Sequence, residues 1–350
     1  MFNSKAKLTA VFLISALGFI VYFNSLGGQF IRDDNALVKN NIYIKNPANL
    51  AKCFTRNIAL GSPEKWNSYR PLQMFTYMLD YQIWKLKPAG YHLTNILLHI
   101  LTGIMLYFFI YAVFGDSILS LYTSLLFIAH PVHTQAVSYI SGRADSLAAV
   151  FLLFCFILYI RFLGLSTKGT FLFMVISYLG ALFSRENSLI LPGLLILYHF
   201  SLKKKFRASS FSALSCIALI YIVLRLTLLK SLLSNISYPT TFIQRLPGFF
   251  AAMAEYFRLI ILPFNLHASY GLKLFSFSDP KVIAGIFVTL ILVFYALKKR
   301  KQDSLILFSI GWFFMALLPQ SNLYPINAYM AEHWLYLPSV GFFLIVANFF

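Results

Sequence analysis

Two adjacent carboxylates, Asp33 and Asp34, follow the first apolar run of the sequence and have the clearest capacity for chemistry. A carboxylate that faces a cavity at a membrane surface can act as a general base and remove a proton from a hydroxyl group. The pair also has a structural explanation, because Asp often caps a helix or lies solvated in a loop. The two residue types alone leave both explanations open.

Other charged and polar residues lie beside apolar runs. An ionised side chain costs about 2.5–3.5 kcal/mol at the bilayer centre on insertion scales, so charged residues near these runs need an explanation. Arginine and histidine in such places can bind a phosphate group. Neighbouring Arg–Asp and Arg–Glu residues could equally be topology anchors or structural salt bridges. The candidate substrate-binding residues are Tyr69, Arg70, His92, His133, Arg143, Asp145, Arg185, Glu186, Glu332 and His333.

A polar stripe runs along one predicted helix. His92, Asn95 and His99 are spaced by three and four residues and therefore share one helix face. Because lipid cannot satisfy polar groups, such a stripe faces a cavity or forms hydrogen bonds to another helix. Both alternatives stay open.

The next predicted span carries a similar set of polar residues, His130, His133, Thr134 and Ser138, and Pro131 is expected to kink it. The two histidines could bind a metal ion, but the sequence offers no obvious third ligand. We therefore predict no metal site, and no cofactor is firmly implied. A divalent metal would be compatible with the sequence but has no support in it.

The composition identifies the elements that must position these residues. Hydrophobic residues make up 59% of the 350 residues and charged residues only 11%, against about 25% charged residues in a soluble domain. Such a chain cannot cover a water-facing surface, so the sequence predicts an all-α polytopic membrane protein. A spanning helix needs about 20 apolar residues. The ten predicted spans are residues 8–24, 91–113, 119–138, 145–163, 170–185, 188–202, 209–228, 281–297, 304–320 and 334–350.

The basic residues predict the orientation of these spans. They form short clusters between apolar runs, as in residues 203–207 and 298–301, so the net charge of +18 does not indicate a nucleic-acid partner. Lys and Arg accumulate in cytoplasmic loops, which places the N-terminus inside. The loops that carry the unexplained acidic and arginine residues are then all extracytoplasmic.

We expect a single membrane domain, residues 1–350, with two long extracytoplasmic segments, residues 25–90 and 229–280. Residues 249–266 within the second segment are predicted to form an interfacial or re-entrant helix, because Glu255 and Arg258 interrupt the apolar stretch. The first apolar run lacks a clear cleavage site and is expected to stay as a helix.

An ordered set of short motifs resembles a known family from Tyr22 to Gly341. The motifs are residues 22–34, which end in Asp33-Asp34, then Tyr69-Arg70-Pro71-Leu72, residues 90–99, residues 130–137, Gly142-Arg143-Ala144-Asp145 and residues 331–338. Each motif is weak alone, but the ordered set resembles the transmembrane and tetratricopeptide-repeat-containing O-mannosyltransferases and their bacterial relatives. That family belongs to the GT-C superfamily.

The resemblance implies a GT-C-type helix bundle and a glycosyltransferase of protein O-glycosylation. It implies that Asp33 deprotonates a Ser or Thr hydroxyl and that Asp34 orients the acceptor or the base. A sugar, mannose in this family, would transfer with inversion from a polyprenyl-phosphate donor to an acceptor protein, on the extracytoplasmic side of the plasma (inner) membrane. The candidates to neutralise the leaving phosphate are Arg70, Arg143, Arg185 and His333.

The acceptor is the least defined part of this expectation. Members of the family usually continue into tetratricopeptide repeats, and these 350 residues contain no 34-residue helical repeat; either the natural chain is longer or this member lacks them. A lipid or surface glycan is an alternative acceptor. A transporter or flippase is a further alternative, which the absence of inverted repeats and the placement of the charges on one side disfavour.

Overall fold

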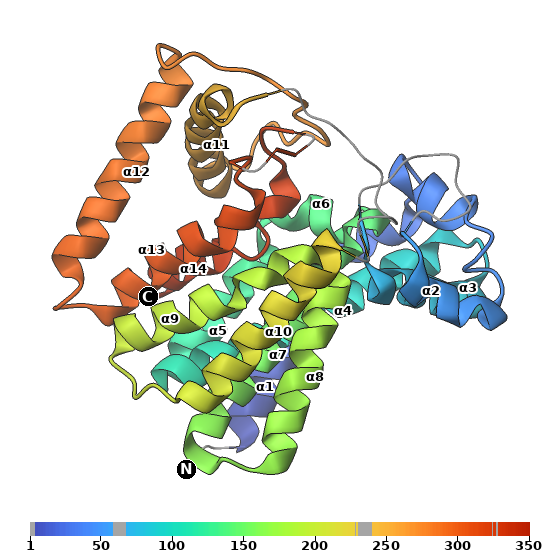
Figure 1. Ribbon diagram of the computed structural model, residues 1–350, viewed down its shortest axis with the longest axis horizontal. Coiled ribbons are helices and arrows are strands. Elements are labelled where there is room, and N and C mark those ends of the chain that lie inside the picture. Colours follow the sequence, from blue (N-terminus) through green and yellow to red (C-terminus); the bar gives the residue numbers. More distant parts are fainter. Residues whose placement is uncertain (1–3, 59–67, 228, 230–239, 324, 327) are drawn as a thin grey trace. The chain divides into compact units, whose positions relative to one another are not determined.

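The computed structural model describes residues 4–58, 68–227, 229, 240–323, 325–326 and 328–350 (Figure 1). The regular elements of these residues are all helices, which confirms the predicted all-α class. Parts of the two predicted extracytoplasmic segments, residues 59–67 and 230–239, lie outside the described residues.

The chain divides into two compact units, and both are discontinuous in sequence. Unit 1 consists of Met1–Ala129, Ala136–Leu189 and Arg207–Ile236, and unit 2 consists of His130–Gln135, Ile190–Phe206 and Ser237–Phe350. The single membrane domain expected from the sequence stays a prediction.

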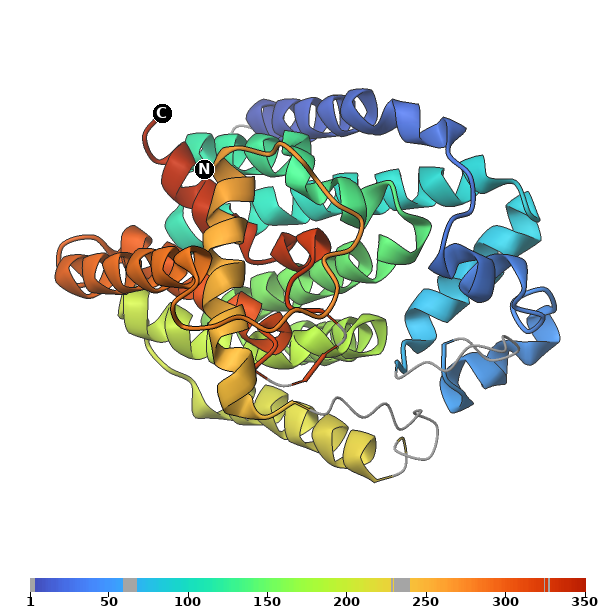
Figure 2. The ribbon, with the colours of Figure 1, turned by 90° about the horizontal axis from the view of Figure 1, so that it is seen from above.

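Unit 1 is a bundle of long helices with shorter helices at one end (Figures 1 and 2). The long helices are α1 (Ser4–Tyr22), α4 (Pro88–Phe114), α5 (Ser117–Ala129), α7 (Arg143–Leu165), α8 (Lys168–Ser184) and α10 (Ala208–Leu226). The short ones are η1 (Phe23–Gly27), η2 (Asn35–Lys39), η3 (Pro47–Asn49), α2 (Leu50–Thr55), α3 (Pro71–Trp84), η5 (Ile140–Gly142) and η6 (Glu186–Ile190), whose last residue counts with unit 2. The helix α6 (Thr134–Val137) is divided between the two units after Gln135.

The bounds of α4 follow from its terminal residues. Pro88 lies in the first turn, where its missing N–H costs nothing, and Gly115 ends the helix with a φ of 76°. Along the helix, Gly103 allows close packing, because a Cβ there would lie 2.6 Å from Ile128 and 3.0 Å from Ile14. α1, α4 and α5 therefore meet in one tightly packed layer.

Unit 2 contains α9 (Leu191–Leu202), α11 (Phe242–Ile261), α12 (Pro280–Lys299), α13 (Ser304–Leu317), η8 (Leu318–Gln320), η9 (Glu332–Leu335) and α14 (Ser339–Ala347), together with η4 (Pro131–His133). A capping box starts α11, since the Thr241 hydroxyl accepts from the Gln244 amide and the Gln244 side chain accepts from the Thr241 amide. α11 contains most of the stretch predicted to be interfacial or re-entrant. Its relation to a bilayer stays a prediction.

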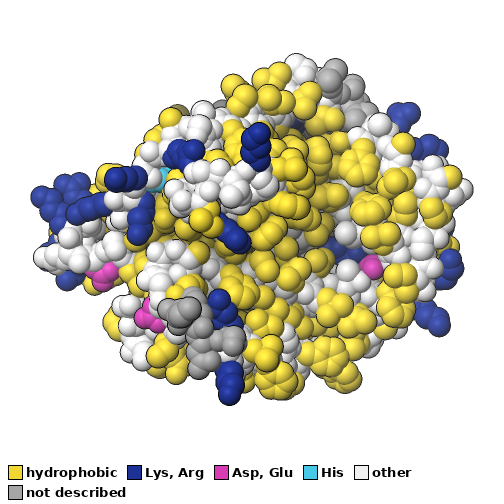
Figure 3. Space-filling model, turned by 90° about the horizontal axis from the view of Figure 1, so that it is seen from below, with side chains coloured by type: hydrophobic (Ala, Val, Ile, Leu, Met, Phe, Trp, Pro, Cys, Tyr) yellow, Lys and Arg dark blue, Asp and Glu magenta, His cyan; other side chains and the backbone are white. Residues whose placement is uncertain are grey.

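Among the residues that the structure describes, five helices are long and apolar enough to cross a membrane by length and composition. They are Lys5–Gly27, Pro88–Phe114, Ile140–Leu165, Ala208–Leu226 and Pro280–Lys299. Large apolar side chains also cover broad areas of the surface, with few acidic residues among them (Figure 3). Each of the ten predicted spans contains a helix, but how many of them cross the bilayer stays a prediction.

The predicted span 119–138 is wrong as a single helix. α5 ends at Ala129, His130 has an extended backbone, and η4 and α6 follow as separate short helices. Pro131 lacks an N–H donor and disfavours a helical conformation in the residue before it. It therefore ends the helix, where we expected a kink, and the polar residues 130–138 do not form a stripe on one helix.

The predicted span 334–350 is also interrupted. η9 ends at Leu335, and α14 begins only after Pro338. Proline lacks the N–H that would donate the next hydrogen bond of the preceding turn. The chain therefore starts a new helix after Pro338, which is a common arrangement.

The packing of Gly285 on α12 predicts that unit 2 is sensitive to a larger side chain at this position. A Cβ at this position would lie 1.8 Å from the Phe250 carbonyl oxygen of α11, so Gly285→Ala must push the two helices apart. We expect a loss of about 3 kcal/mol in the free energy of unfolding, measured by thermal unfolding in detergent. Gly164→Ala is the control, since a Cβ there meets nothing within 4 Å; equal stability of the two variants would contradict the packing.

Candidate active site

The acidic pair lies in a turn after α1, and its two carboxylates have different surroundings. Asp34 is fully buried, and its Oδ1 accepts hydrogen bonds from the Ser141 amide at 2.9 Å and the Ser141 hydroxyl at 2.5 Å. Its Oδ2 accepts from the Ile31 amide at 3.1 Å. Asp33 is only half-buried, and its amide donates to the Tyr139 hydroxyl at 3.0 Å. Asp34 is therefore an internal group, and Asp33 is the partly exposed member of the pair.

Burial also affects the protonation of Asp34. Desolvation raises its pKa from 3.8 to about 6, although hydrogen bonds from Ser141 and Ile31 act in the opposite direction. The Ser141 contact therefore favours the ionised form of this carboxylate.

Arg143 is fully buried behind the pair. Its guanidinium forms an ion pair with Asp80 at 2.6 Å and donates to the Asn95 side chain at 2.8 Å and to the Tyr91 carbonyl at 3.0 Å. The guanidinium carbon also lies 4.6 Å from the centroid of the Tyr77 ring. These contacts join α3, α4 and α7, so the side chain holds the helices together.

The predicted polar stripe of α4 is buried against the protein. The Asn95 amide group donates to the carbonyls of Val137 and Tyr139 at 3.1 and 3.0 Å. His99 Nε2 donates to the Ile128 carbonyl at 3.2 Å. Interhelical and helix-to-loop hydrogen bonds therefore account for these two residues.

His92, the third member of the stripe and a candidate substrate-binding residue, is 3% exposed. A Cβ at Gly28 would lie 2.6 Å from its Nε2. The ring thus packs against the backbone that follows α1, close in sequence to the acidic pair.

Two ion pairs connect four further candidate residues. The Arg70 guanidinium donates to both Glu186 oxygens, at 3.1 and 3.0 Å, and Arg185 pairs with Asp145. Burial raises the pKa of Glu186, but the charge and hydrogen bonds of Arg70, together with the charges of Arg225 and Arg185, outweigh it and hold that pKa well below its usual range. These residues therefore do form salt bridges, but with partners distant in sequence and not with their sequence neighbours.

Unpaired donors remain beside these ion pairs. Arg185 Nε, Arg225 Nη1 and Asn187 Nδ2 are buried and have no hydrogen-bond acceptor among the described residues. An unsatisfied buried donor costs about 1–3 kcal/mol. Arg225 also acts electrostatically on Glu186. We call Arg70, Arg185 and Arg225 the arginine cluster; with Asp145 and Glu186 it carries an excess of positive charge and has the donors that an anion requires.

Sequence reasoning missed Arg225 and Asn187. A signal for Arg225 was present, since it is a charge near the end of the apolar run of α10. Asn187 follows Glu186 directly, but an asparagine in a loop has no pattern that distinguishes it.

α3 links the arginine cluster to the acidic pair. Arg70 precedes the first turn of α3, and one turn later the Gln73 side chain donates to the Ser141 carbonyl at 3.0 Å. A further turn along, the Tyr77 hydroxyl donates to the Ile140 carbonyl at 3.0 Å. Ser141 therefore contacts both α3 and Asp34, and unit 1 holds both groups in one continuous network.

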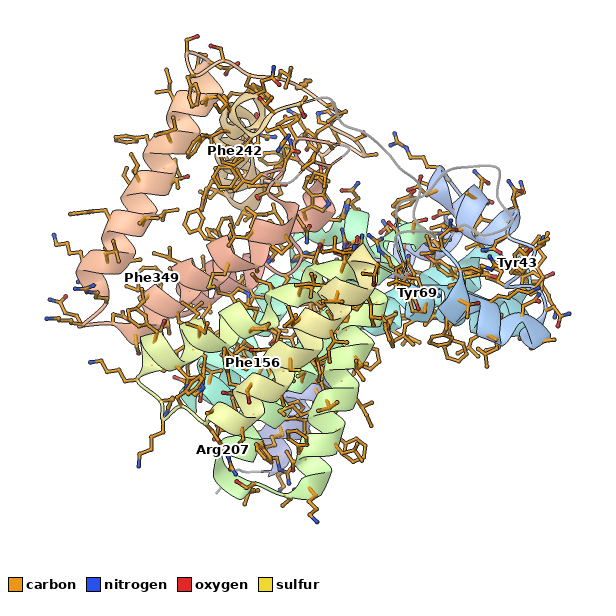
Figure 4. The ribbon with its side chains drawn as sticks, viewed as in Figure 1. Tyr43, Tyr69, Phe156, Arg207, Phe242 and Phe349 are labelled. Carbon is orange, nitrogen blue, oxygen red and sulfur yellow. The ribbon has the colours of Figure 1, made fainter. Side chains whose placement is uncertain are left out.

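Tyr69, labelled in Figure 4, is also part of this region. Its hydroxyl donates to the Phe54 carbonyl at 2.6 Å, and its ring is buried. Because Tyr69 directly precedes Arg70, this contact ties the chain next to Arg70 to α2, which gives Tyr69 a positioning role.

Glu332 and His333 belong to unit 2. Glu332 is buried, which raises its pKa, and its Oε1 accepts from the His267 amide at 2.5 Å and the Tyr270 hydroxyl at 2.7 Å. The His333 amide donates to the Gln135 side chain at 3.0 Å. Sequence reasoning missed His267 and Tyr270, which lie in the second predicted extracytoplasmic segment.

The two histidines of the 130–138 region face different partners. His130 Nε2 donates to the Ile260 carbonyl at 2.9 Å, whereas His133 is fully buried with Ser339 Oγ at 3.4 Å. Across the part of the chain that the structure describes, no three or more His, Cys, Asp or Glu residues are grouped to hold a metal ion.

No protein-family model matches the chain. It is similar to a protein O-mannosyl-transferase of Caenorhabditis elegans, with 27% identity over 356 residues that cover 97% of this chain and 51% of the worm protein. Human protein O-mannosyl-transferase TMTC1 is 33% identical over 225 residues, or 60% of this chain and 26% of that protein. Human TMTC3 is 33% identical over 165 residues, or 46% of this chain and 18% of that protein. The chain thus spans about half the length of the worm relative and less of the human ones.

Among solved structures, the fold is similar to that of ArnT from Cupriavidus metallidurans bound to undecaprenyl phosphate. The TM-score is 0.52 at 15% identity, and the match covers 96% of this chain and 59% of that one. This likeness concerns the fold and confirms the GT-C-type bundle that the motifs implied. The chain is an integral membrane protein with a GT-C-type fold, and its sequence is similar to proteins named protein O-mannosyl-transferases.

Proposed function

We propose that the protein is a membrane glycosyltransferase that moves a sugar, mannose, from a polyprenyl-phosphate donor to Ser or Thr hydroxyls of proteins, with inversion. The observation that carries this proposal is the unequal acidic pair, one buried and one half-exposed carboxylate, linked through α3 to an arginine cluster with unfilled donors. The names of the relatives support a mannosyl donor and a protein acceptor. The undecaprenyl phosphate bound to ArnT, whose fold is similar, supports a lipid-linked donor.

Asp33 is the proposed general base. It removes the proton of the acceptor hydroxyl as the hydroxyl oxygen attacks the anomeric carbon of the sugar, and the bond from that carbon to the phosphate oxygen breaks. Such a base contributes about 10²–10⁴-fold to the rate. Asp34, with its oxygens occupied by Ser141 and Ile31, supports the turn that carries Asp33.

The arginine cluster is the proposed site of the leaving phosphate. Donors that already point at the place where negative charge develops stabilise a transition state without reorganisation. Arg185 Nε, Arg225 Nη1 and Asn187 Nδ2 are such donors. Arg143 takes no part in this site in our proposal, because its charge is neutralised by Asp80 inside the bundle.

We also propose that the site is extracytoplasmic, at the plasma (inner) membrane. Arg143 and Asp145 lie at the start of α7, and Arg185 follows the end of α8. The basic residues 203–207 follow α9 and precede α10. The positive-inside rule assigns that basic loop to the cytoplasm, which leaves the acidic pair and the arginine cluster for the other side.

Asp33→Asn should abolish transfer while the fold stays intact. We expect a loss of at least about 100-fold in transfer of labelled mannose from polyprenyl-phosphate mannose to protein in membranes, with an unchanged melting temperature. Asp116→Asn is the matched control, because Asp116 is exposed and caps α5, a role that Asn also fills. Wild-type transfer by Asp33→Asn would show that another residue is the base.

Arg225→Gln should weaken the phosphate site. Loss of a hydrogen bond to a charged group removes about 1.5–3 kcal/mol, so we expect kcat/KM for the lipid donor to fall about 10- to 150-fold. Arg161→Gln, which removes an exposed arginine from α7, is the control. If both variants keep wild-type kcat/KM, the arginine cluster does not bind the donor.

Asp34 should leave a signature in the pH dependence of stability. Its pKa in the folded chain is about 6, against an ordinary value of 3.8, so the folded state favours the protonated form. Stability from this group is therefore full below pH 4 and falls by about 3 kcal/mol as the pH rises to 6. In thermal unfolding, wild type should lose stability relative to Asp34→Asn between pH 4 and 6; parallel curves would contradict the shift.

A further inference from the structure

The turn that carries the acidic pair contains a strained residue. Arg32, directly before Asp33, has a φ of 45°, a left-handed conformation that non-glycine residues rarely adopt. The Asp34 amide donates to the Ile31 carbonyl at 2.9 Å, and the Ile31 amide donates to the Asp34 carboxylate at 3.1 Å. Strain of this kind persists only where the surroundings fix the conformation, and it concentrates at functional sites.

Residues 139–141 supply those surroundings. The Asp33 amide donates to the Tyr139 hydroxyl at 3.0 Å, and the Ser141 hydroxyl donates to Asp34 Oδ1 at 2.5 Å. One hydroxyl of this segment therefore contacts the backbone of Asp33, and a second contacts the carboxylate of Asp34. We call these two hydroxyls the hydroxyl clamp.

The hydroxyl clamp is itself held from behind. Asn95 of α4 donates to the Tyr139 carbonyl at 3.0 Å, and Gln73 of α3 donates to the Ser141 carbonyl at 3.0 Å. Functional side chains keep a productive geometry when a second layer of hydrogen bonds from rigid helices fixes them. Through the hydroxyl clamp, α3 and α4 therefore determine where the acidic pair lies.

Position matters strongly for a base. A general base must lie about 2.6–3.2 Å from the proton's oxygen in a productive complex. A misplacement of about 1 Å costs about 100-fold in rate. The direction of the Asp33 side chain follows from its backbone, and the amide of that backbone contacts the Tyr139 hydroxyl.

We propose that Tyr139 and Ser141 are positioning residues: without touching the substrate, their hydroxyls hold the strained turn so that Asp33 points at the acceptor hydroxyl. This inference rests on the proposed function, in which Asp33 is the base. It adds two residues that the motifs did not single out, one of them 106 positions from the carboxylate it orients.

The test compares Tyr139→Phe and Ser141→Ala with Ser141→Thr in the full chain, in membranes. The first two remove one hydroxyl each and should lower kcat for mannosyl transfer about 10- to 100-fold, with the donor KM within about twofold of wild type. Ser141→Thr keeps the hydroxyl and should restore kcat. Tyr81→Phe is the control, since no hydrogen bond of the Tyr81 hydroxyl takes part in the clamp.

A second measurement separates this inference from the proposed function. Hydrogen–deuterium exchange of a peptide spanning residues 29–38 should quicken in Tyr139→Phe and stay unchanged in Tyr81→Phe, whether or not the chain transfers sugar. If wild type exchanges as fast as Tyr139→Phe, or if Tyr139→Phe and Ser141→Ala keep wild-type kcat, the positioning role is wrong. Absence of transfer by wild type, with faster exchange in Tyr139→Phe, would refute the enzyme and retain the clamp.

Discussion

A buried charge pair organises unit 1. Arg143 is fully enclosed, and Asp80 neutralises it at 2.6 Å. Removing one partner of a buried pair leaves an uncompensated charge and costs about 3–5 kcal/mol, so the helices around it are committed to one arrangement. Ser141, which hydrogen-bonds to Asp34, lies two residues before Arg143. The buried ion pair therefore also determines where that contact lies. The location of the acidic pair is thus decided by a residue that takes no part in the proposed chemistry.

Many polar groups of unit 1 pair with one another. Asn95 and Gln73 bond to backbone carbonyls, and Arg70 is paired with Glu186. Arg185 Nε, Arg225 Nη1 and Asn187 Nδ2, by contrast, have no acceptor among the described residues, and in our proposal the phosphate of the lipid donor supplies one. An unpaired polar group stands out more in a membrane protein than in a soluble enzyme, because lipid offers no hydrogen-bond partner in place of water.

The sequence predicts which segments form helices, but it says less about which side chains contact one another. Ten apolar runs each contain a helix, and the family resemblance leads to the correct fold, because hydrophobic length and local motifs are properties of neighbouring residues. Pro131 is expected to form a kink, although it ends α5, since the spacing of polar residues continues past it. Arg143 is one of four candidates for the phosphate, and only the folded chain reveals that Asp80 is paired with it. The contact between Asp33 and Tyr139 joins residues 106 positions apart, which no sequence spacing predicts.

The division of the chain has a consequence for its biosynthesis. Residues 130–135 belong to unit 2, although unit 1 surrounds them in sequence. Their polar partners are Ile260, His333 and Ser339, which the ribosome makes more than a hundred residues later. During synthesis His130, His133 and Gln135 therefore emerge before the partners to which they hydrogen-bond in the folded chain. Their final contacts can form only after the last third of the chain has been made.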